Sequence, residues 1–432
     1  MTTPIPPAPI LLKNTRVIDP ASQRDEVTDL FLLEGLLLPV PATLPANTLC
    51  LEARGTLATP GFLDLHVHFR DPGGLAAETL MSGSRAAAAG GFTHVVTMPN
   101  SSPACDTPAL LQRQFDPQLA VRILPAACIT AGRQGQQLAD MEALAAAGAM
   151  AFTDDGAMVS DPALMAAAMQ RARQLDRVIM DHAVLPALAG PGVIRACAAA
   201  TQFQLPIFPP EAEIAAVEQD IRLCRQTGAR LHLQHLSCAA SVAAIRAARR
   251  AGLPVSGEAS PHHLALAAED ILTDDGNLRM NPPLGNREDL RMLREAVLDG
   301  TLSALATDHA PHAPATKSRG FLQAPFGVIG LETAAAVTYT LLVEQEGLPL
   351  LDWVARWTTG PAAILGIPPP TLADGAPANL ALFDIVTPWR VQPAQFQSLS
   401  RNCPFADWTL RGKPLLTICA GRLTWRDAVR LR

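Results

Sequence analysis

Residues 61–74 read GFLDLHVHFRDPGG, an apolar run that carries His66 and His68 and is followed at once by Pro72 and two glycines. Side chains two positions apart on a β-strand share a face, so both imidazoles can point to the same side of a buried strand. The Pro-Gly-Gly segment turns the chain directly after them and exposes the strand end. Two imidazoles placed in this way can converge on one metal ion, although packing histidines would explain this single pair equally well.

Seven further apolar runs that end in polar residues follow along the chain. They are THVVTMPN (93–100), VRILPAAC (121–128), AMAFTDD (149–155), RVIMDH (177–182), ARLHLQH (229–235), PVSGEAS (254–260) and SALATDH (303–309). Segments of helical character separate them, such as NREDLRMLREAVLDG (286–300), which opens on a capping Asn. Eight buried strands that alternate with helices indicate an α/β fold, a (β/α)8 barrel of the TIM type. In such a barrel the active site lies at the carboxyl ends of the strands.

The two ends of the chain read differently from this repeating unit. Residues 1–58 include LLKNTRVID and TLCLEARGTL, and residues 371–432 include APANLALFDI and PLLTICAGRLTW. These stretches have the character of β-strands. We expect them to pair into one small β-domain beside a barrel that spans residues 59–370.

The composition excludes several classes of function. The 432 residues are 49% hydrophobic and 17% charged, with a net charge of −6, and they lack the basic stripe that a nucleic-acid-binding protein needs. No apolar run is long enough to span a membrane, and LFLLEGLLLPV, for example, is cut by Glu34 and Pro39. Eight scattered cysteines and the absence of a basic region before the first apolar stretch favour a cytoplasmic protein without a signal peptide. We also expect a homo-oligomer that has neither nucleic-acid nor membrane partners.

The polar residues at the other strand ends favour a metal-binding role for His66 and His68 over a packing role. They are Asp154 and Asp155 after the fourth run, His182 after the fifth, His235 after the sixth and Asp308 after the eighth. Four imidazoles with two carboxylates can hold two divalent ions, one carboxylate bridging them. Burial of so many polar groups without metal would be costly, so the set as a whole predicts a metal centre.

The remaining histidines give weaker signals. His232 lies within a strand and is expected to be a packing residue, and His262 and His263 follow a strand end and could be either packing or functional residues. His309 neighbours Asp308 but should point away from it. His312 lies in the following loop, over the barrel mouth, and is the one of these to which we assign a functional role.

Six segments of the chain resemble the class I bacterial dihydroorotases of the amidohydrolase superfamily. They are DLHVHFRDPG, TMPN, FTDDG, MNPPL, ATDHAPH and APFGVIGLET, and the likeness continues into the C-terminal stretch NCPFADWTLRGKPLLTICAGR. Single segments also occur in hydantoinases and allantoinases. The full set in this order is specific to dihydroorotases.

The resemblance implies a role for each matching position. His66 and His68 would bind the more buried metal, His182 and His235 the second, and Asp308 would be both a ligand and the catalytic acid/base. The resemblance to FTDDG selects Asp155 as the ligand of the fourth strand and leaves Asp154 to bond nearby backbone. The residues that would contact the substrate are His68, Arg70, Asn100, Asn281, His312, Phe326 and Gly327, of which Arg70, Asn100 and His312 would form the clamp for its carboxylate.

The lysines limit how the two metals can be bridged. Many binuclear relatives use a lysine carboxylated by carbon dioxide, but lysine occurs here only at Lys13, Lys317 and Lys413. None lies between His68 and His235, so we expect no carboxylated lysine, and Asp155 would bridge the ions instead. Histidine and carboxylate ligands suit two zinc ions, and manganese or cobalt would fit the same ligands.

The function implied is the reversible cyclisation of N-carbamoyl-L-aspartate to L-dihydroorotate in de novo pyrimidine biosynthesis. One alternative is another cyclic amidohydrolase, a hydantoinase or an allantoinase, although neutral hydantoins need no carboxylate clamp. The other is a catalytically silent scaffold for aspartate transcarbamoylase, which is also a possible partner of an active enzyme. Retention of every ligand favours the active enzyme.

The segment AVLPALAGPGV after His182 replaces the acidic segment usual in the family, so the resemblance does not extend to the contacts of this loop.

Overall fold

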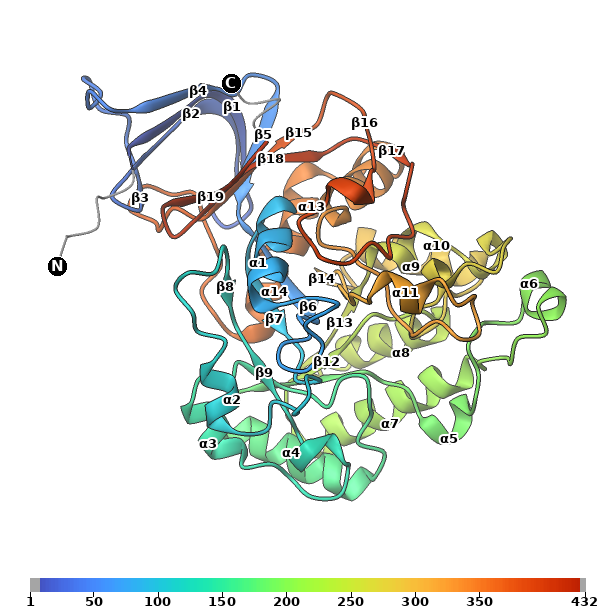
Figure 1. Cartoon of the computed structure of the whole chain (residues 1–432). Coiled ribbons are helices and arrows are strands. Elements are labelled where there is room, and N and C mark those ends of the chain that lie inside the picture. The colour runs from blue at the N-terminus through green and yellow to red at the C-terminus, as the bar shows by residue number, and fades with distance from the viewer. Residues whose placement is uncertain (1–7, 428–432) are drawn as a thin grey trace.

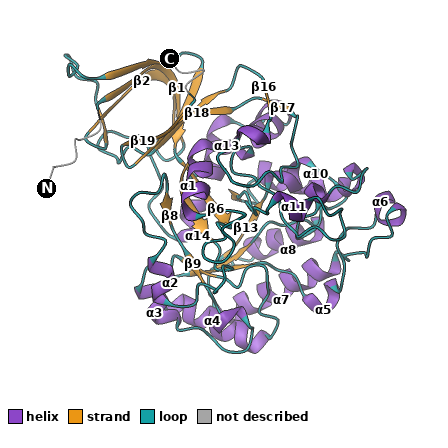
Figure 2. Ribbon diagram, in the orientation of Figure 1, coloured by secondary structure: helices purple, strands orange, loops and turns teal. Residues whose placement is uncertain are grey.

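The computed structural model describes residues 8–427 of the chain, which form two groups of strands (Figure 1). Strands from both ends of the chain, blue and orange-red in Figure 1, make one sheet at the side of the molecule. Parallel strands from the middle of the chain lie inside a layer of helices (Figure 2). The parallel strands and the surrounding helices confirm the predicted α/β class.

The terminal sheet has the strand order β19-β18-β15-β5-β1-β2-β3, with β4 paired to β1. Its strands are β1 (Ile10–Asp19), β2 (Arg24–Leu33), β3 (Leu36–Leu38), β4 (Leu49–Glu52), β5 (Thr56–Pro60), β15 (Leu380–Asp384), β18 (Lys413–Cys419) and β19 (Arg422–Arg426). The two ends of the chain meet where β5 pairs antiparallel with β15, with Ala58 opposite Leu382. Alternate residues of these strands are buried in a core of their own that includes Leu12, Leu380 and Ile418.

The inner strands form two parallel sheets with the orders β6-β7-β8 and β14-β13-β12-β11-β10-β9. They are β6 (Phe62–Val67), β7 (Phe92–Thr97), β8 (Arg122–Ile123), β9 (Ala126–Ala127), β10 (Ala151–Phe152), β11 (Val178–Asp181), β12 (Leu231–Leu233), β13 (Val255–Ala259) and β14 (Ala304–Leu305). The run 121–128 was expected to form one strand but forms two, β8 and β9. Pro125, which has no N–H to donate, lies between them.

The two parallel sheets are connected at both edges. Beyond β8, the N–H of Leu124 donates to Val95 O of β7, whereas Pro125 O accepts the N–H of Met150 beside β10. At the opposite edge the residue after β6 donates to the chain after β14, since His68 N–H lies 2.9 Å from His309 O. The carboxyl ends of β6 and β14 therefore lie next to each other.

Helices connect the successive parallel strands. The longer ones are α1 (Leu80–Ala89), α3 (Met141–Ala146), α4 (Pro162–Gln174), α7 (Glu211–Thr227), α8 (Ala239–Arg250), α10 (Arg287–Leu298), α13 (Leu350–Trp357) and α14 (Thr359–Leu365). Short elements are α2 (Pro108–Gln112), α5 (Pro186–Ala189), α6 (Ala198–Gln202), α9 (Pro261–Ala265), α11 (Pro314–Lys317), α12 (Ala334–Thr338), β16 (Trp389–Arg390) and β17 (Thr409–Leu410). The predicted start of α10 is confirmed, because Asn286 Oδ1 accepts the N–H of Asp289 at 2.9 Å.

Within residues 8–427, none of the helices combines the length and the apolar character that crossing a bilayer requires.

A cluster of aromatic rings joins the terminal sheet to the first parallel strand. Phe62 of β6 stacks on Phe383 of β15, with ring centroids 5.1 Å apart, and on Trp357 of α13, at 5.7 Å. Phe92 and Trp353 meet Phe62 edge-on. Because these side chains are fully buried, the position of β6 depends on contacts with the C-terminal part of the chain, which supplies Trp353, Trp357 and Phe383.

We predict that Phe383→Ala lowers the free energy of unfolding by about 3–4 kcal/mol, because it removes a ring from this closed cluster and leaves a cavity. Urea unfolding followed by tryptophan fluorescence measures the effect. The control is Val386→Ala, just after β15, where the side chain is 63% exposed and a change below about 0.5 kcal/mol is expected. Equal effects of the two substitutions would contradict the role of the cluster.

Candidate functional site

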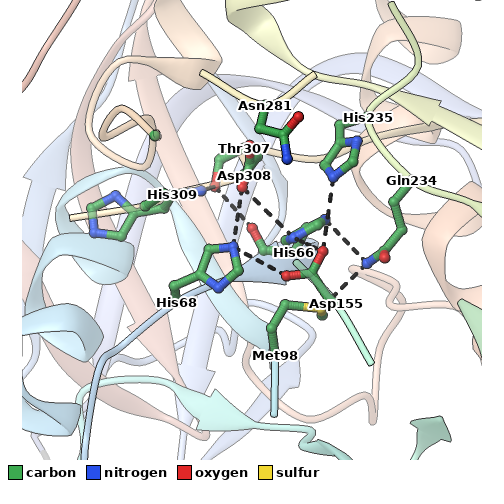
Figure 3. Close-up of polar contacts among 12 residues, drawn as sticks. His66, His68, Met98, Asp155, Gln234, His235, Asn281, Thr307, Asp308 and His309 are labelled. Carbon is green, nitrogen blue, oxygen red and sulfur yellow. Dashed lines mark hydrogen bonds and ion pairs between the residues drawn. The ribbon is translucent and has the colours of Figure 1, made fainter. Parts of the chain in front are cut away.

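The six predicted ligands lie together at the carboxyl ends of the parallel strands. The residues are His66 in β6, His68 just after it, Asp155 beyond β10, His182 after β11, His235 beyond β12 and Asp308 beyond β14. All six are buried, and Figure 3 shows five of them pointing toward one another. A cavity of about 250 Å³ opens above them, and all of them except His66 line it.

His66, His68 and Asp308 form a first group of candidate ligand atoms. Asp308 Oδ1 lies 3.1 Å from His68 Nε2 and 3.6 Å from His66 Nε2. The ligand atoms of the three residues lie within 4.8 Å of one another, which is a spacing that one cation can fill. His66 Nε2 is buried and makes no hydrogen bond with the described residues, as expected for an atom that binds an ion.

The second group contains His182 and His235, whose Nδ1 and Nε2 atoms lie only 2.8 Å apart. Asp155 Oδ1 is 3.7 Å from His182 Nδ1, 3.8 Å from His235 Nε2 and 3.3 Å from His66 Nε2. This oxygen, too, is buried and has no hydrogen bond among the described residues. Asp155 therefore lies between the two groups, as a bridging carboxylate would.

The tautomer of His182 depends on Asn281. The Asn281 side-chain amide lies 3.0 Å from His182 Nε2. If Nδ1 is the ligand atom, Nε2 carries the proton, and the amide then presents its oxygen as the acceptor. Asn281 can thus hold the ring of His182 in the ligating orientation while it faces the cavity.

The electrostatics of the cluster favour a cation. Burial raises the pKa of Asp155, but the charge of His66 and the close imidazoles of His235 and His68 outweigh it and hold this pKa well below its usual range. For Asp308, a hydrogen bond from His68 likewise outweighs burial and lowers the pKa. Burial lowers the pKa of His66, but the Asp155 carboxylate and other acidic neighbours bring it well above its usual value. Two buried ionised carboxylates require positive charge close by.

Two acidic residues behind the ligands were missed by the sequence analysis. Glu258 in β13 has one oxygen 3.2 Å from His66 Nδ1 and the other 2.9 Å from His232 Nε2, and it accepts the N–H of His235. These hydrogen bonds outweigh burial and lower the pKa of Glu258 to about 2. A carboxylate on the second ring nitrogen of a ligating histidine fixes the tautomer and orientation of the ring. His232, which was expected to be a packing residue, is part of this support.

The second missed residue is Asp64, which accepts hydrogen bonds from the N–H groups of His66 and Thr307 at 3.1 and 3.0 Å. Asp64 thereby ties β6 to the end of β14. Each of these acids stands alone inside a buried apolar run, FLDLHVH or PVSGEAS, and that isolation is the signal that could have identified them.

Asp154 points away from the cluster. Its carboxylate accepts the N–H groups of Ile129 and Thr130 at 2.8 and 3.1 Å. The expectation that Asp154 bonds nearby backbone is therefore confirmed. Arg133 donates to the carbonyl oxygens of Asp154 and Asp155 and fixes the turn that carries them.

The predicted substrate contacts line the cavity beside the cluster. Asn100 Oδ1 lies 2.9 Å from His68 Nδ1, and its amide nitrogen donates to Asp155 at 3.3 Å. Arg70 Nε donates to Pro311 O at 3.3 Å. His312 Nε2 lies 2.6 Å from Phe326 O, and burial together with Arg70 lowers the pKa of His312 to about 3, so the ring is neutral.

Three other histidines lie outside the lining of the cavity. His309 Nε2 lies 3.4 Å from Glu78, and the ring points away from the cluster in Figure 3, as expected. His262 and His263 both contact Ser260 Oγ, and His263 also reaches Pro282 O. For the pair left open by the sequence, these contacts are those of packing residues.

Comparison with known proteins agrees with this geometry. The family described as dihydro-orotase-like matches residues 55–241. The chain is 42% identical to a dihydroorotase of Syntrophotalea carbinolica, over 96% of this chain and 99% of the relative, and 41% identical to one of Geobacillus, over 93% and 95%.

Solved structures show the same fold at lower identity. The L-hydantoinase of Arthrobacter aurescens superposes with a TM-score of 0.83 at 24% identity, over 97% of this chain and 96% of that one. The dihydropyrimidinase of Brevibacillus agri gives 0.83 at 21% identity, over 97% and 95%. Relatives above 40% identity along nearly the whole sequence indicate a shared family, and the chain therefore belongs to the dihydroorotases of the amidohydrolase superfamily.

Proposed function

We propose that this protein is a dihydroorotase that interconverts N-carbamoyl-L-aspartate and L-dihydroorotate in de novo pyrimidine biosynthesis. The observation that carries the proposal is the cavity in which a histidine–aspartate cluster and the half-buried guanidinium of Arg70 face the same space. A substrate with a cyclic amide and a carboxylate needs both features. The names of the curated relatives support the same activity.

The fold that supports this activity is a closed (β/α)8 barrel with a small β-domain. We propose that the two parallel sheets close into one barrel, since Leu124–Pro125 bridges β8 and β9 and His68 bonds to His309 at the other edge. The proposed boundaries are 59–370 for the barrel and 1–58 with 371–432 for the β-domain.

The cluster would hold two divalent metal ions. His66 and His68 would bind one, His182 and His235 the other, and Asp155 would bridge them, with Asp308 as a further ligand. Zinc suits these ligands, and manganese or cobalt would also fit. When bound, the ions polarise the scissile carbonyl and lower the pKa of a water molecule. The unpartnered Nε2 of His66 and Oδ1 of Asp155 support this assignment.

Asp308 would move the proton. Its lowered pKa keeps the carboxylate ionised at neutral pH, so it can accept the proton of the attacking water. As the ring C–N bond breaks, Asp308 returns this proton to the amide nitrogen. His68, 3.1 Å from Asp308 Oδ1, holds the carboxylate in position.

The substrate carboxylate would meet Arg70, Asn100 and His312. The planar guanidinium of Arg70 can donate two parallel hydrogen bonds to a carboxylate, while His312, whose one N–H is directed at Phe326 O, would border the carboxylate. Asn281 and the Phe326–Gly327 turn would border the ring. These contacts argue against a hydantoinase, whose neutral substrate lacks a carboxylate, and the intact ligand set argues against a silent scaffold.

The setting of the enzyme is also a proposal. We propose a cytoplasmic homo-oligomer whose partner is its small-molecule substrate, and we retain aspartate transcarbamoylase as a possible protein partner. The scattered cysteines and the acidic net charge of −6 support the compartment and the lack of nucleic-acid binding.

We predict that the purified protein loaded with zinc hydrolyses L-dihydroorotate and forms it from N-carbamoyl-L-aspartate, with far lower activity on hydantoin and dihydrouracil. Absorbance of the ring amide follows the reaction. Asp308→Asn, expected to keep its metal but lose nearly all turnover, controls for contaminating enzymes. A preference for hydantoin would favour the hydantoinase alternative, and metal binding without turnover on any of these substrates would favour the scaffold.

We predict that Asp155→Ala loses at least one metal ion per chain and nearly all activity, because the Asp155 carboxylate lies within 4 Å of histidines of both groups. Metal content by mass spectrometry measures the loss. Wild-type apoprotein should regain activity with zinc equally well with and without bicarbonate. A bicarbonate requirement would show that a carboxylated group, not Asp155, bridges the ions.

We predict that Arg70→Lys raises the KM for dihydroorotate roughly ten-fold or more, because a point charge replaces the two-pronged donor. Metal content should stay at the wild-type level. The matched control is Arg113→Lys, a 58% exposed side chain outside the cavity lining. An unchanged KM for the Arg70 variant would mean that the substrate carboxylate binds elsewhere.

A further inference from the structure

A buried lysine lies behind the cavity wall and has no part in the chemistry described above. Lys317 ends the short helix α11 and is only 4% exposed. Its ammonium lies 2.8 Å from Gly327 O, 2.9 Å from Pro325 O and 3.2 Å from Arg279 O. An ammonium has three N–H donors, and these three carbonyl oxygens use all of them.

The same turn is held from a second side by Asn402, which comes from the C-terminal part of the chain. Asn402 Nδ2 donates to Gly327 O and to Ala310 O at 3.1 and 3.0 Å, and its Oδ1 accepts the N–H of His312. Gly327 O is therefore shared by Lys317 and Asn402. Neither of these residues lines the cavity, but both bind the segments that do.

The turn they hold is tightly confined. Gly327 has a φ of +120°, and a Cβ at this position would lie 2.5 Å from the Ala310 Cβ and 3.2 Å from His312 Nε2. Phe326 O lies 2.6 Å from His312 Nε2. The Arg279 guanidinium packs over the Phe326 ring, with its central carbon 4.2 Å from the ring centroid. A small shift of the turn would move His312, which faces the cavity.

Burial of an ammonium here costs stability that an apolar side chain would not. Burial, with a smaller contribution from Arg279, lowers the pKa of Lys317 to about 7, while Asp275 opposes the shift. A Met side chain has a similar length and volume and would fill the same space without this cost. A charge kept under the wall of a binding cavity therefore points to function rather than to packing.

We propose that Lys317 is a positioning residue for substrate binding: its ammonium fixes the Pro325–Gly327 turn, and through it His312, against the bound substrate. The inference rests on the proposed function, in which the substrate occupies this cavity. Lys317 touches neither the ligand cluster nor the cavity, so it acts equally on the ground state and the transition state. Its loss should raise KM and leave kcat and metal content nearly unchanged.

The experiment compares Lys317→Met with Lys413→Met, the same substitution in the terminal sheet. Both zinc-loaded variants and the wild type are assayed for dihydroorotate hydrolysis. We expect an increase in KM of about ten-fold for Lys317→Met, with kcat within about two-fold and normal zinc content, and wild-type kinetics for Lys413→Met. In Lys317→Ala, added propylamine should lower KM, whereas propanol should not, because the missing group is a charged donor.

A pH profile provides a second readout, and its wild-type part does not require a folded variant. The charged or titratable groups that face Lys317 are Arg279, Asp275 and His312, and the last is neutral because its pKa is about 3. Below pH 7 the ammonium serves all three carbonyls, and above it one donor is lost, so the wild-type KM should rise. In Lys317→Met this rise should be absent.

The outcomes separate the two proposals. Absence of wild-type turnover would refute the proposed function and, with it, this inference. Wild-type turnover combined with an unchanged KM in Lys317→Met would refute the positioning role alone, as would loss of zinc together with kcat. If Lys317→Met does not fold, a wild-type KM that is flat between pH 6 and 9 would also overturn the proposal.

Discussion

The Asp155 carboxylate is the point on which the rest of the site depends. One of its oxygens lies between 3.3 and 3.8 Å from imidazole nitrogens of His66, His182 and His235, which come from three different strands. Repulsion between the lone pairs of the imidazoles and the cost of burying an ionised carboxylate would both be relieved by the proposed cations between them. Since the groups converge only because the parallel strands end at one level, the proposed metal centre depends on the strand arrangement.

Buried carboxylates behind the ligands extend this dependence into the fold. Glu258 in β13 connects the His66 ring to the backbone of His235, so one side chain orients a ligand from each histidine group. Asp64 performs the corresponding task between β6 and Thr307 near the end of β14. The ligand geometry is thus set by contacts that cross strands, which leaves the loops above the site free to determine substrate contacts.

The fold class and the six clustered residues could be predicted because their signals are local. A buried strand that carries two histidines at alternate positions can be recognised from about eight consecutive residues. A polar residue at the end of an apolar run is likewise a local signal of a site residue. The contacts of Lys317 and Asn402 could not be predicted, since they depend on how the loops pack and follow no recurring spacing. Glu258 did leave a signal, its isolation in an apolar run. The break of 121–128 into two strands follows from Pro125, a residue whose missing N–H could have given the warning. The domain boundaries still rest on the pattern of the sequence.

The pairing of β5 with β15 constrains how the chain is made. During synthesis the N-terminal strands and the histidine pair of β6 leave the ribosome first, but the partner strand of β5 and the ring of Phe383 that packs on Phe62 come near the end. Contacts between segments so distant in the sequence form late and slowly. Until β15 has been synthesised, one edge of β5 therefore stays unpaired. Truncation before β15 would therefore leave the edge of β5 open to pairing with other chains, and aggregation would be the expected result.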